Sequence, residues 1–151
     1  MPTRFTGSRA EMRTLDTFIK LTRCTNSVLA RLSERNTIGD LTPSQFAVLE
    51  ALYHLGSMTQ GEISNKILKS TSNLTTVIDN LERTGLVRRE RNAKDRRVIH
   101  VHLTTAGMSK IETLFPNHVA ALVEIFSILS ASEQETLGVL CKKLGKGKEA
   151  E

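Results

Sequence analysis

The sequence has few of the features that stabilise or anchor secreted and membrane proteins. It contains two cysteines, Cys24 and Cys141, too few for a disulfide scaffold. No apolar run reaches the ~18 residues of a membrane span, and the N-terminus lacks the apolar segment of a signal peptide. We therefore expect a cytoplasmic protein with no membrane partner.

Motifs of the common enzyme classes are also missing. The sequence contains no nucleophile elbow, no phosphate-binding glycine loop and no zinc-protease helix signature. His100 and His102 would share one face of a strand, but no cysteine or carboxylate completes a recognisable ligand spacing. His54 and His118 are isolated and are interpreted as structural residues. We expect neither an enzyme nor a metal or cofactor site.

What the sequence does contain is a concentrated positive charge. Its formal net charge is +5, and the segment from residue 83 to residue 97 accounts for all of it, with seven basic residues against Glu90 and Asp95. A basic surplus confined to one place indicates a polyanionic partner, most often nucleic acid. The alternative is a basic hairpin that is merely solvated.

Residues 71–84 have the pattern of an amphipathic helix. Apolar residues at helical spacing predict its buried stripe: Leu74, Val77, Ile78 and Leu81. The opposite face carries short polar side chains and a cation: Ser72, Thr76, Asp79 and Arg83. Hydroxyls of residues 70–72 supply an N-cap, and Gly85 is placed to end the helix. Such an exposed face suits hydrogen bonding to base edges.

Residues 59–103 combine this helix with a shorter helix and a hairpin. Thr59 and Glu62 have the capping-box spacing of a helix start, with Ile63 and Ile67 as buried positions and residues 68–71 as the turn. Residues 86–91 and 98–103 flank a charged stretch at 92–97, which predicts a β-hairpin with a charged tip. This order predicts a winged helix-turn-helix that docks on DNA.

Further helices are expected on both sides of this unit. Apolar spacing predicts a helix of about 25 residues near the N-terminus. Thr42 as N-cap and Pro43 at the first position begin a helix over 43–54, which Gly56 ends. Another helix follows Thr104, and Pro116 should kink or interrupt it.

The last helix is expected to begin at a capping box formed by Ser132 and Glu135 and to end before Gly145, with residues 146–151 disordered. The helices at the two ends of the chain have more apolar surface than one small domain can cover. We therefore expect them to pack across a two-fold axis in a homodimer.

Three runs resemble the MarR-type family of bacterial transcription regulators. Residues 41–46 (LTPSQF) are similar to the family's helix start ahead of the DNA-binding unit, and residues 75–82 (TTVIDNLE) resemble its recognition helix. Residues 95–97 (DRR) and 103–107 (LTTAG) resemble its wing and the helix that follows. The resemblance implies a mainly α fold with a small β-hairpin wing. It assigns residues 41–104 to a winged helix-turn-helix domain and residues 1–40 and 105–151 to dimerisation helices.

DNA contacts are expected first on the recognition helix, because the N-terminal half of such a helix enters the major groove. The candidates are Ser70, Ser72, Asn73, Thr75, Thr76 and Arg83. Asp79 is expected to pair with Arg83 one turn further on rather than to accept a hydrogen bond from a cytosine amine. A solvated polar face without a DNA role is the alternative.

The wing supplies the second set of expected contacts. The resemblance implies that Arg97 enters the minor groove and that Asp95 is the acidic partner that orients it. Lys94 and Arg96 would then contact phosphates. A hairpin salt bridge without a DNA role is the alternative.

These expectations converge on a homodimeric repressor that reads a pseudo-palindromic operator. The resemblance implies a small effector, often aromatic or phenolic, bound between the winged domain and the dimer helices. One alternative is a winged-helix protein-interaction module, against which the basic wing counts. Another is a redox switch using Cys24. That cysteine lies closer to Pro43 than a sensing cysteine is expected to, and no tyrosine accompanies it, so we interpret it as a buried small hydrophobe.

Overall fold

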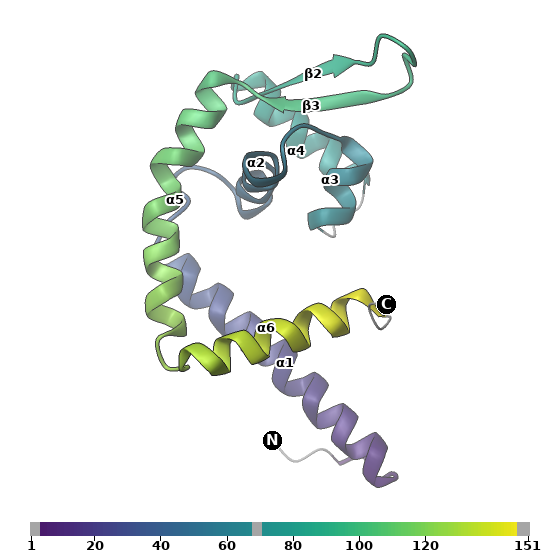
Figure 1. Cartoon of the computed structure of the whole chain (residues 1–151), viewed down its shortest axis with the longest axis vertical. Helices are drawn as coiled ribbons and strands as arrows, with labels where there is room; N and C mark the ends of the chain where they lie inside the picture. The colour runs from purple at the N-terminus through teal and green to yellow at the C-terminus, as the bar shows by residue number, and fades with distance from the viewer. Residues whose placement is uncertain (1–3, 68–70, 148–151) are drawn as a thin grey trace. The chain divides into compact units, whose positions relative to one another are not determined.

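The computed structural model describes residues 4–67 and 71–147, which form helices and one small sheet (Figure 1). The elements in chain order are α1 (Arg9–Glu34), α2 (Pro43–Leu55), β1 (Met58–Thr59), α3 (Gln60–Ile67), α4 (Thr71–Arg83), β2 (Val87–Arg91), β3 (Ile99–Leu103), α5 (Thr105–Phe126) and α6 (Ala131–Lys146). This confirms the predicted fold class, mainly α with a hairpin wing.

No single helix in the described ranges is long and apolar enough to cross a membrane. Helices α5 and α6 meet that test only as a pair, across a bend of 104°.

The chain divides into two compact units. One, the winged unit, comprises Thr37–Val119, and the other, the terminal unit, comprises Met1–Asn36 together with Ala120–Glu151. The border therefore falls inside α5, whereas the sequence led us to expect it at residues 104–105. The reason is packing: Ile111 of α5 is fully buried in the core of the winged unit, and Leu114 and Phe115 pack against that core.

The core of the winged unit is built from α2, α3, α4, the sheet and the first half of α5. Its fully buried side chains are Val48, Leu49, Ile63, Leu74, Ile78, Leu81, Val87, Val101 and Ile111. Three of the four residues predicted as the buried stripe of α4 are among them, and Val77 is half-buried. Helical spacing in the sequence therefore identified the face of α4 that the core covers.

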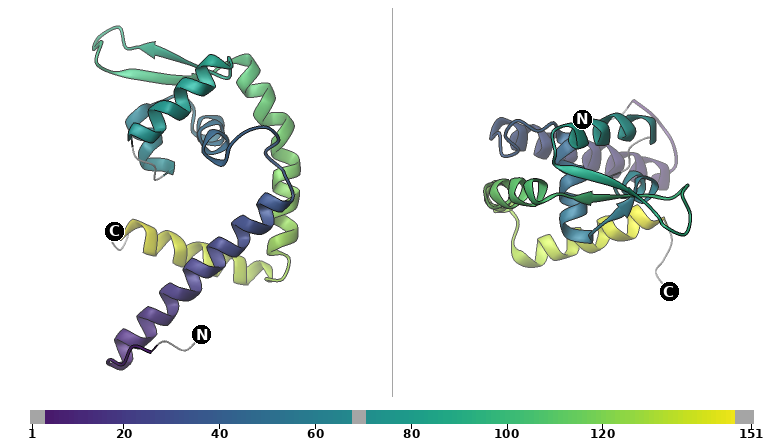
Figure 2. Two further views of the ribbon diagram at one scale, coloured as in Figure 1. Left: turned by 180° about the vertical axis from the view of Figure 1, so that it is seen from behind. Right: turned by 90° about the horizontal axis from the view of Figure 1, so that it is seen from above.

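The sheet has three antiparallel strands in the order β1-β3-β2. The predicted hairpin is present, and its register runs from Val87 opposite Leu103 to Arg91 opposite Ile99. The sequence did not predict β1, because a strand of two residues shows no alternation. Its Met58 is buried and lies opposite Val101. In each view the loop between β2 and β3 projects beyond the helices of the same unit (Figures 1 and 2).

Helix boundaries follow the local chemistry. At the start of α2, the side chains of Thr42 and Gln45 each bond the other residue's backbone N–H, and Pro43 occupies the first position. Gly56 ends the helix with φ 79°, a conformation that glycine adopts without a Cβ clash. These boundaries agree with the prediction over 43–54 to within one residue.

Pro116 was expected to kink or interrupt the helix, and the interruption does not occur, since α5 is one helix from Thr105 to Phe126. Pro116 is exposed, while Ile111 before it and Ile125 after it are buried. Packing on both sides of the proline offsets the roughly 3 kcal/mol that a proline costs inside a helix.

The predicted ends of α6 are also wrong. Its capping box joins Ser130 to Glu133, two residues before the predicted pair, and Ser132 lies within the helix, where its carbonyl accepts from Thr136. Both serines precede a glutamate at the same spacing, so the sequence did not distinguish them. The helix passes Gly145 and includes Lys146, ending at Gly147 with φ 67°.

The terminal unit has much less buried surface of its own. Neither α1 nor α6 contains a buried residue in the described chain, and Phe18 is 62% exposed. Cys24 is exposed as well, so our expectation of a buried cysteine is wrong for the single chain. At the end of α1, the guanidinium of Arg35 donates to both carboxylate oxygens of Glu124, with Nη2 to Oε1 at 2.8 Å.

Candidate nucleic-acid interface

The recognition helix α4 presents the polar face that the sequence predicted. Asn73, Thr75, Thr76, Asp79 and Arg83 are exposed on it, opposite the buried stripe. Ser70 and residues 68–70 of the predicted turn lie outside the described residues. Of Ser72 only the backbone is described, as part of α4.

The short helix α3 supports the start of this face. The Glu62 carboxylate accepts from the backbone N–H of Thr59 at 2.7 Å, and this bond and that of the Thr59 hydroxyl lower the pKa of Glu62. The predicted capping box is thereby confirmed. The neighbouring Gln60 donates from Nε2 to the Thr75 hydroxyl at 2.5 Å, which ties α3 to the recognition helix. The sequence analysis did not identify Gln60, although its position at the first residue of α3 was visible.

The wing tip is shaped by two side chains that bond its backbone. The Oδ1 atom of Asn92 accepts from the N–H of Lys94 at 2.8 Å, and Oδ1 of Asp95 accepts from the N–H of Arg97 at 3.0 Å. Within the described residues no ion pair joins the side chains of Asp95 and Arg97. Asp95 therefore orders the turn that carries Arg97, rather than the guanidinium itself.

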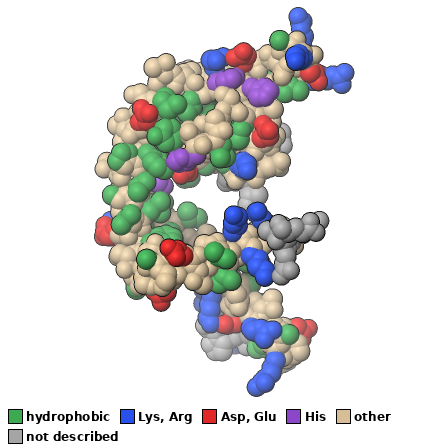
Figure 3. Space-filling model, viewed as in Figure 1, with side chains coloured by type: hydrophobic (Ala, Val, Ile, Leu, Met, Phe, Trp, Pro, Cys, Tyr) green, Lys and Arg blue, Asp and Glu red, His purple; other side chains and the backbone are tan. Residues whose placement is uncertain are grey.

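Basic side chains gather at this tip (Figure 3). Lys94, Arg96 and Arg97 are exposed. Further down the strand, Arg88 pairs with Glu90 at 2.6 Å, and this hydrogen bond lowers the pKa of Glu90. The positive charge of the wing is therefore least compensated at the tip, the part that projects furthest from the helices.

On the outer face of the sheet, His102 contacts two polar side chains, and the sequence analysis did not identify these contacts. Nδ1 of His102 lies 2.6 Å from the Ser57 hydroxyl, and Nε2 lies 3.5 Å from the Glu90 carboxylate. His102 and Glu90 come from adjacent strands of the hairpin, so hairpin register could have suggested their proximity.

The expected Asp79–Arg83 pair is wrong. Asp79 instead contacts Arg89 of β2, with Oδ1 2.6 Å from Nη2, while Nη2 of Arg83 donates to the side-chain oxygen of Asn80 at 2.7 Å. The spacing rule for helices considers only neighbours on the same helix. It could not find a partner on the strand that packs against that helix.

Of the isolated histidines, His118 is structural, as predicted. Its Nδ1 lies 3.0 Å from the Thr37 hydroxyl, both residues are buried, and the imidazole centroid is 4.6 Å from that of Phe46. Burial lowers the pKa of His118, because the charged imidazolium is poorly solvated there.

A polar recognition helix held on a compact core and followed by a hairpin with a cationic tip is the arrangement of a winged helix-turn-helix DNA-binding protein. The MarR family model matches residues 41–99. The MhqR regulator of Bacillus subtilis (strain 168) is 35% identical over 133 residues, which span 88% of this chain and 92% of that regulator. The chain belongs to the MarR family. It is a transcription regulator that binds DNA, and the family is not one of enzymes.

Two further similarities bear on function. The transcriptional repressor MdtR of Bacillus subtilis (strain 168) is 32% identical over 111 residues, which span 74% of this chain and 72% of MdtR. Among solved structures, one concerns the regulation of DNA binding of Bordetella bronchiseptica BpsR by 6-hydroxynicotinic acid. It is 25% identical with a TM-score of 0.76, over 86% of this chain and 98% of that one.

Proposed function

We propose that this chain is a homodimeric repressor that binds a pseudo-palindromic operator and is released from it by a small hydroxylated aromatic effector. The observation that carries the proposal is the presence of two exposed surfaces on one core: the polar face of α4 and the cationic tip of the wing. These are the two parts with which a winged helix-turn-helix reaches base edges and backbone.

On DNA, the first half of α4 lies in the major groove, with Asn73, Thr75 and Thr76 at base edges or phosphates. The wing lies over the adjacent backbone. There Lys94 and Arg96 contact phosphates, and Arg97 enters the minor groove, where a narrow groove attracts a cation. Ser70, Ser72 and Arg83 complete the proposed contacts.

The homodimer is supported by the exposed apolar side chains of the terminal unit. Leu29 on α1 and Leu140 and Leu144 on α6 are each more than half exposed in the single chain. Soluble proteins seldom leave so many large apolar groups in water, and an isologous contact would cover them on both copies. In this proposal residues 41–104 read the DNA, and residues 1–40 and 105–151 join the two copies.

The repressor and the effector are proposed by analogy with the relatives. MdtR is named as a repressor, and the DNA binding of BpsR is regulated by 6-hydroxynicotinic acid, which is a hydroxylated aromatic acid. The present chain carries no motif that identifies effector contacts. A regulator that binds the chromosome acts in the cytoplasm, and we propose that location.

The test is a binding assay across a salt series, with the protein's own upstream DNA and a scrambled duplex. We expect tighter binding to the native duplex, an affinity that falls steeply with salt, and release by 6-hydroxynicotinic acid or a simple phenol used as probes. Equal, weak binding to both duplexes would favour a winged-helix protein-interaction module. Running the assay reduced and oxidised separates an effector-controlled regulator from a thiol switch.

A further inference from the structure

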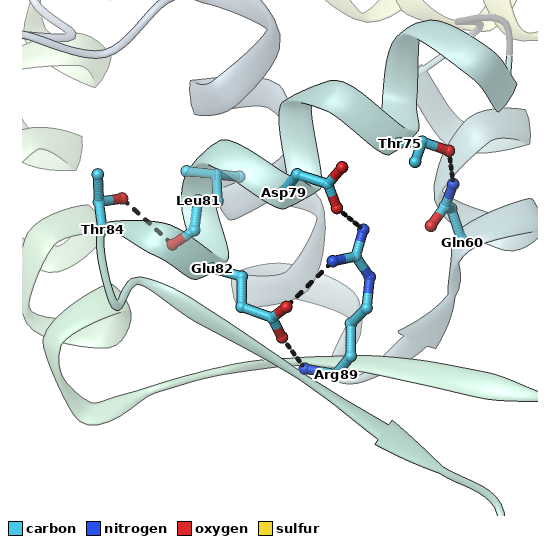
Figure 4. Close-up of polar contacts among 7 residues, drawn as sticks. All are labelled: Gln60, Thr75, Asp79, Leu81, Glu82, Thr84 and Arg89. Carbon is cyan, nitrogen blue, oxygen red and sulfur yellow. Dashed lines mark hydrogen bonds and ion pairs between the residues drawn. The ribbon is translucent and has the colours of Figure 1, made fainter.

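The side chain of Arg89 links the recognition helix to the wing (Figure 4). From the middle of β2, its Nη2 lies 2.6 Å from Oδ1 of Asp79, and its Nη1 lies 3.1 Å from Oε1 of Glu82. The other oxygen of Glu82 accepts from the backbone N–H of Arg89 at 2.8 Å. One arginine therefore contacts both carboxylates of α4, and one of these carboxylates also bonds the strand's backbone.

Strand register explains why Arg89 faces the helix while its neighbours do not. Arg89 lies opposite Val101, which is fully buried, whereas Arg88 lies opposite His102 and Glu90 lies opposite His100. Because residues directly opposite share a face of the sheet, Arg89 projects to the core side and Arg88 to the outer side. The Arg89 side chain is accordingly only 20% exposed, against 55% for Arg88.

The turn between α4 and β2 supplies further contacts, at the base of the strand. The backbone turn holds the base of the hairpin, where Leu86 N–H bonds the Leu81 carbonyl at 2.9 Å and the Thr84 hydroxyl bonds the same carbonyl at 3.2 Å. The buried side chain of Val87 belongs to the same core cluster as Leu81 of α4 and holds the strand at this same end. The Arg89 bonds lie further along the strand and fix the strand against α4 at a second point.

Charge argues against Arg89 as a contact to DNA. Asp79 is 58% exposed and Glu82 41% exposed on the recognition helix, and both carboxylates would repel phosphates. The guanidinium is already shared between them, and its five donors suit this forked geometry better than lysine would. It offsets their charge and is less accessible than the cations of the wing tip.

We propose that Arg89 is a positioning residue. Through Asp79 and Glu82 it fixes the angle between the recognition helix and the wing, so that the helix and the wing can enter the major and minor grooves of DNA together. Arg89 does not itself contact DNA. The proposal rests on the DNA-reading surfaces proposed above. It predicts that loss of Arg89 misaligns the two surfaces without removing a phosphate contact.

The first test is a double-mutant cycle on DNA, using a duplex that the wild-type chain selects from a random library. Arg89→Gln should weaken binding about tenfold, an effect typical of coupled neighbours, with the salt slope unchanged. In the Asp79→Asn/Glu82→Gln background the same substitution should cost little more. Equal losses in both backgrounds, together with a salt slope lower by about one phosphate, would show a direct contact and overturn the proposal.

The second test measures the angle without DNA. Spin labels at Asn73→Cys on α4 and Ala93→Cys on the wing, in a Cys24→Ser/Cys141→Ser chain, report the distance between the two surfaces. Arg89→Gln should broaden the distance distribution, and Arg88→Gln, on the outer face of the same strand, should not. An unchanged distribution with Arg89→Gln would overturn the proposal.

Two controls keep the outcome decisive. If Arg89→Gln lowers the melting temperature strongly, Arg89→Lys replaces it, because lysine retains the charge but can bond only one carboxylate at a time. Arg89→Lys should broaden the label-distance distribution to an intermediate extent. An unbroadened distribution would count against a positioning role. If Thr76→Ala and Arg97→Ala leave DNA binding intact, the proposed reading surfaces fail. The label distances would still decide the role of Arg89.

Discussion

The winged unit and the terminal unit differ in how much of their apolar surface they bury. In the winged unit three helices, a sheet and half of α5 enclose a core in which nine of the described side chains are less than 2% exposed. In the terminal unit α1 and α6 have no buried residue, and large apolar side chains such as Phe18 and Ile128 remain exposed. Large exposed apolar side chains of this kind are typical of a surface that a partner covers. The difference supports the proposal that the winged unit reads DNA and that the terminal unit joins two copies.

The largest effect that would sharpen this comparison is loss of the dimer. Deletion of residues 1–33 removes α1 almost entirely, and with it much of the exposed apolar surface, so we expect a monomer. Deletion of residues 146–151, which carry little apolar surface, should leave the dimer intact. Light scattering gives the mass in each case. A full-length chain that is a stable monomer would contradict the proposal, whatever the truncated chains do.

Matched substitutions in the two units should affect different properties, namely folding stability in one and dimerisation in the other. Ile78→Ala removes a fully buried side chain and should cost about 2 to 5 kcal/mol of unfolding free energy. Leu140→Ala removes a side chain that is 57% exposed in the single chain, so its cost should appear mainly as weaker dimerisation. Denaturation at several protein concentrations separates them, because only the second loss should depend on concentration. A concentration-independent loss of stability in Leu140→Ala would break the comparison.

Within the winged unit, the two reading surfaces should also respond differently. Thr76→Ala lies on the proposed major-groove face and should cost about 1 to 3 kcal/mol on the cognate duplex, with non-specific binding nearly intact. Arg97→Ala should weaken binding to cognate and scrambled DNA alike and lower the salt slope by about one phosphate. Flanking A-tracts would reveal any groove-width preference of Arg97. Wild-type affinity and salt slope in Arg97→Ala would remove the wing from the docking model.

The same contrast explains what the sequence could predict. Periodicity found the buried stripe of α4 and the hairpin arms, because burial on one face gives each element a regular pattern. Capping chemistry located the start of α2 within one residue, since Thr42, Pro43 and Gln45 all indicate the same position. At α6 two overlapping serine–glutamate pairs satisfied the same rule, and local sequence could not choose between them.

The sequence could not predict contacts between elements that are distant in the chain. Asp79 has a plausible partner four residues on, yet the strand brings Arg89 to it, and a helix rule contains no information about that strand. Cys24 was expected to be a buried small hydrophobe, but it is exposed in the single chain, and the sequence of its own helix does not say what covers it. Both errors concern what packs against a helix rather than the helix itself.

A smaller effect is expected from pH. Burial lowers the pKa of His118, so the unfolded chain takes up this proton at a higher pH than the folded winged unit does. The stability contributed by the neutral imidazole is therefore complete above the unfolded pKa of about 6.5 and is lost as pH falls through the lower folded value. His118→Phe should flatten the stability profile over that interval. Melting at closely spaced pH values measures it, and an unaltered profile would contradict the assignment.

The smallest expected effect concerns the two thiols, both of which are exposed and lie in the terminal unit. Neither is on the surfaces proposed to read DNA, so Cys24→Ser should leave DNA affinity unchanged. Hydroperoxide should then release neither the native protein nor the variant, and Cys141→Ser is the matched control because it alters the other exposed thiol. If peroxide releases DNA from the native protein and from Cys141→Ser but not from Cys24→Ser, oxidation at α1 controls the winged unit, and the terminal unit is a sensor as well as an assembly surface.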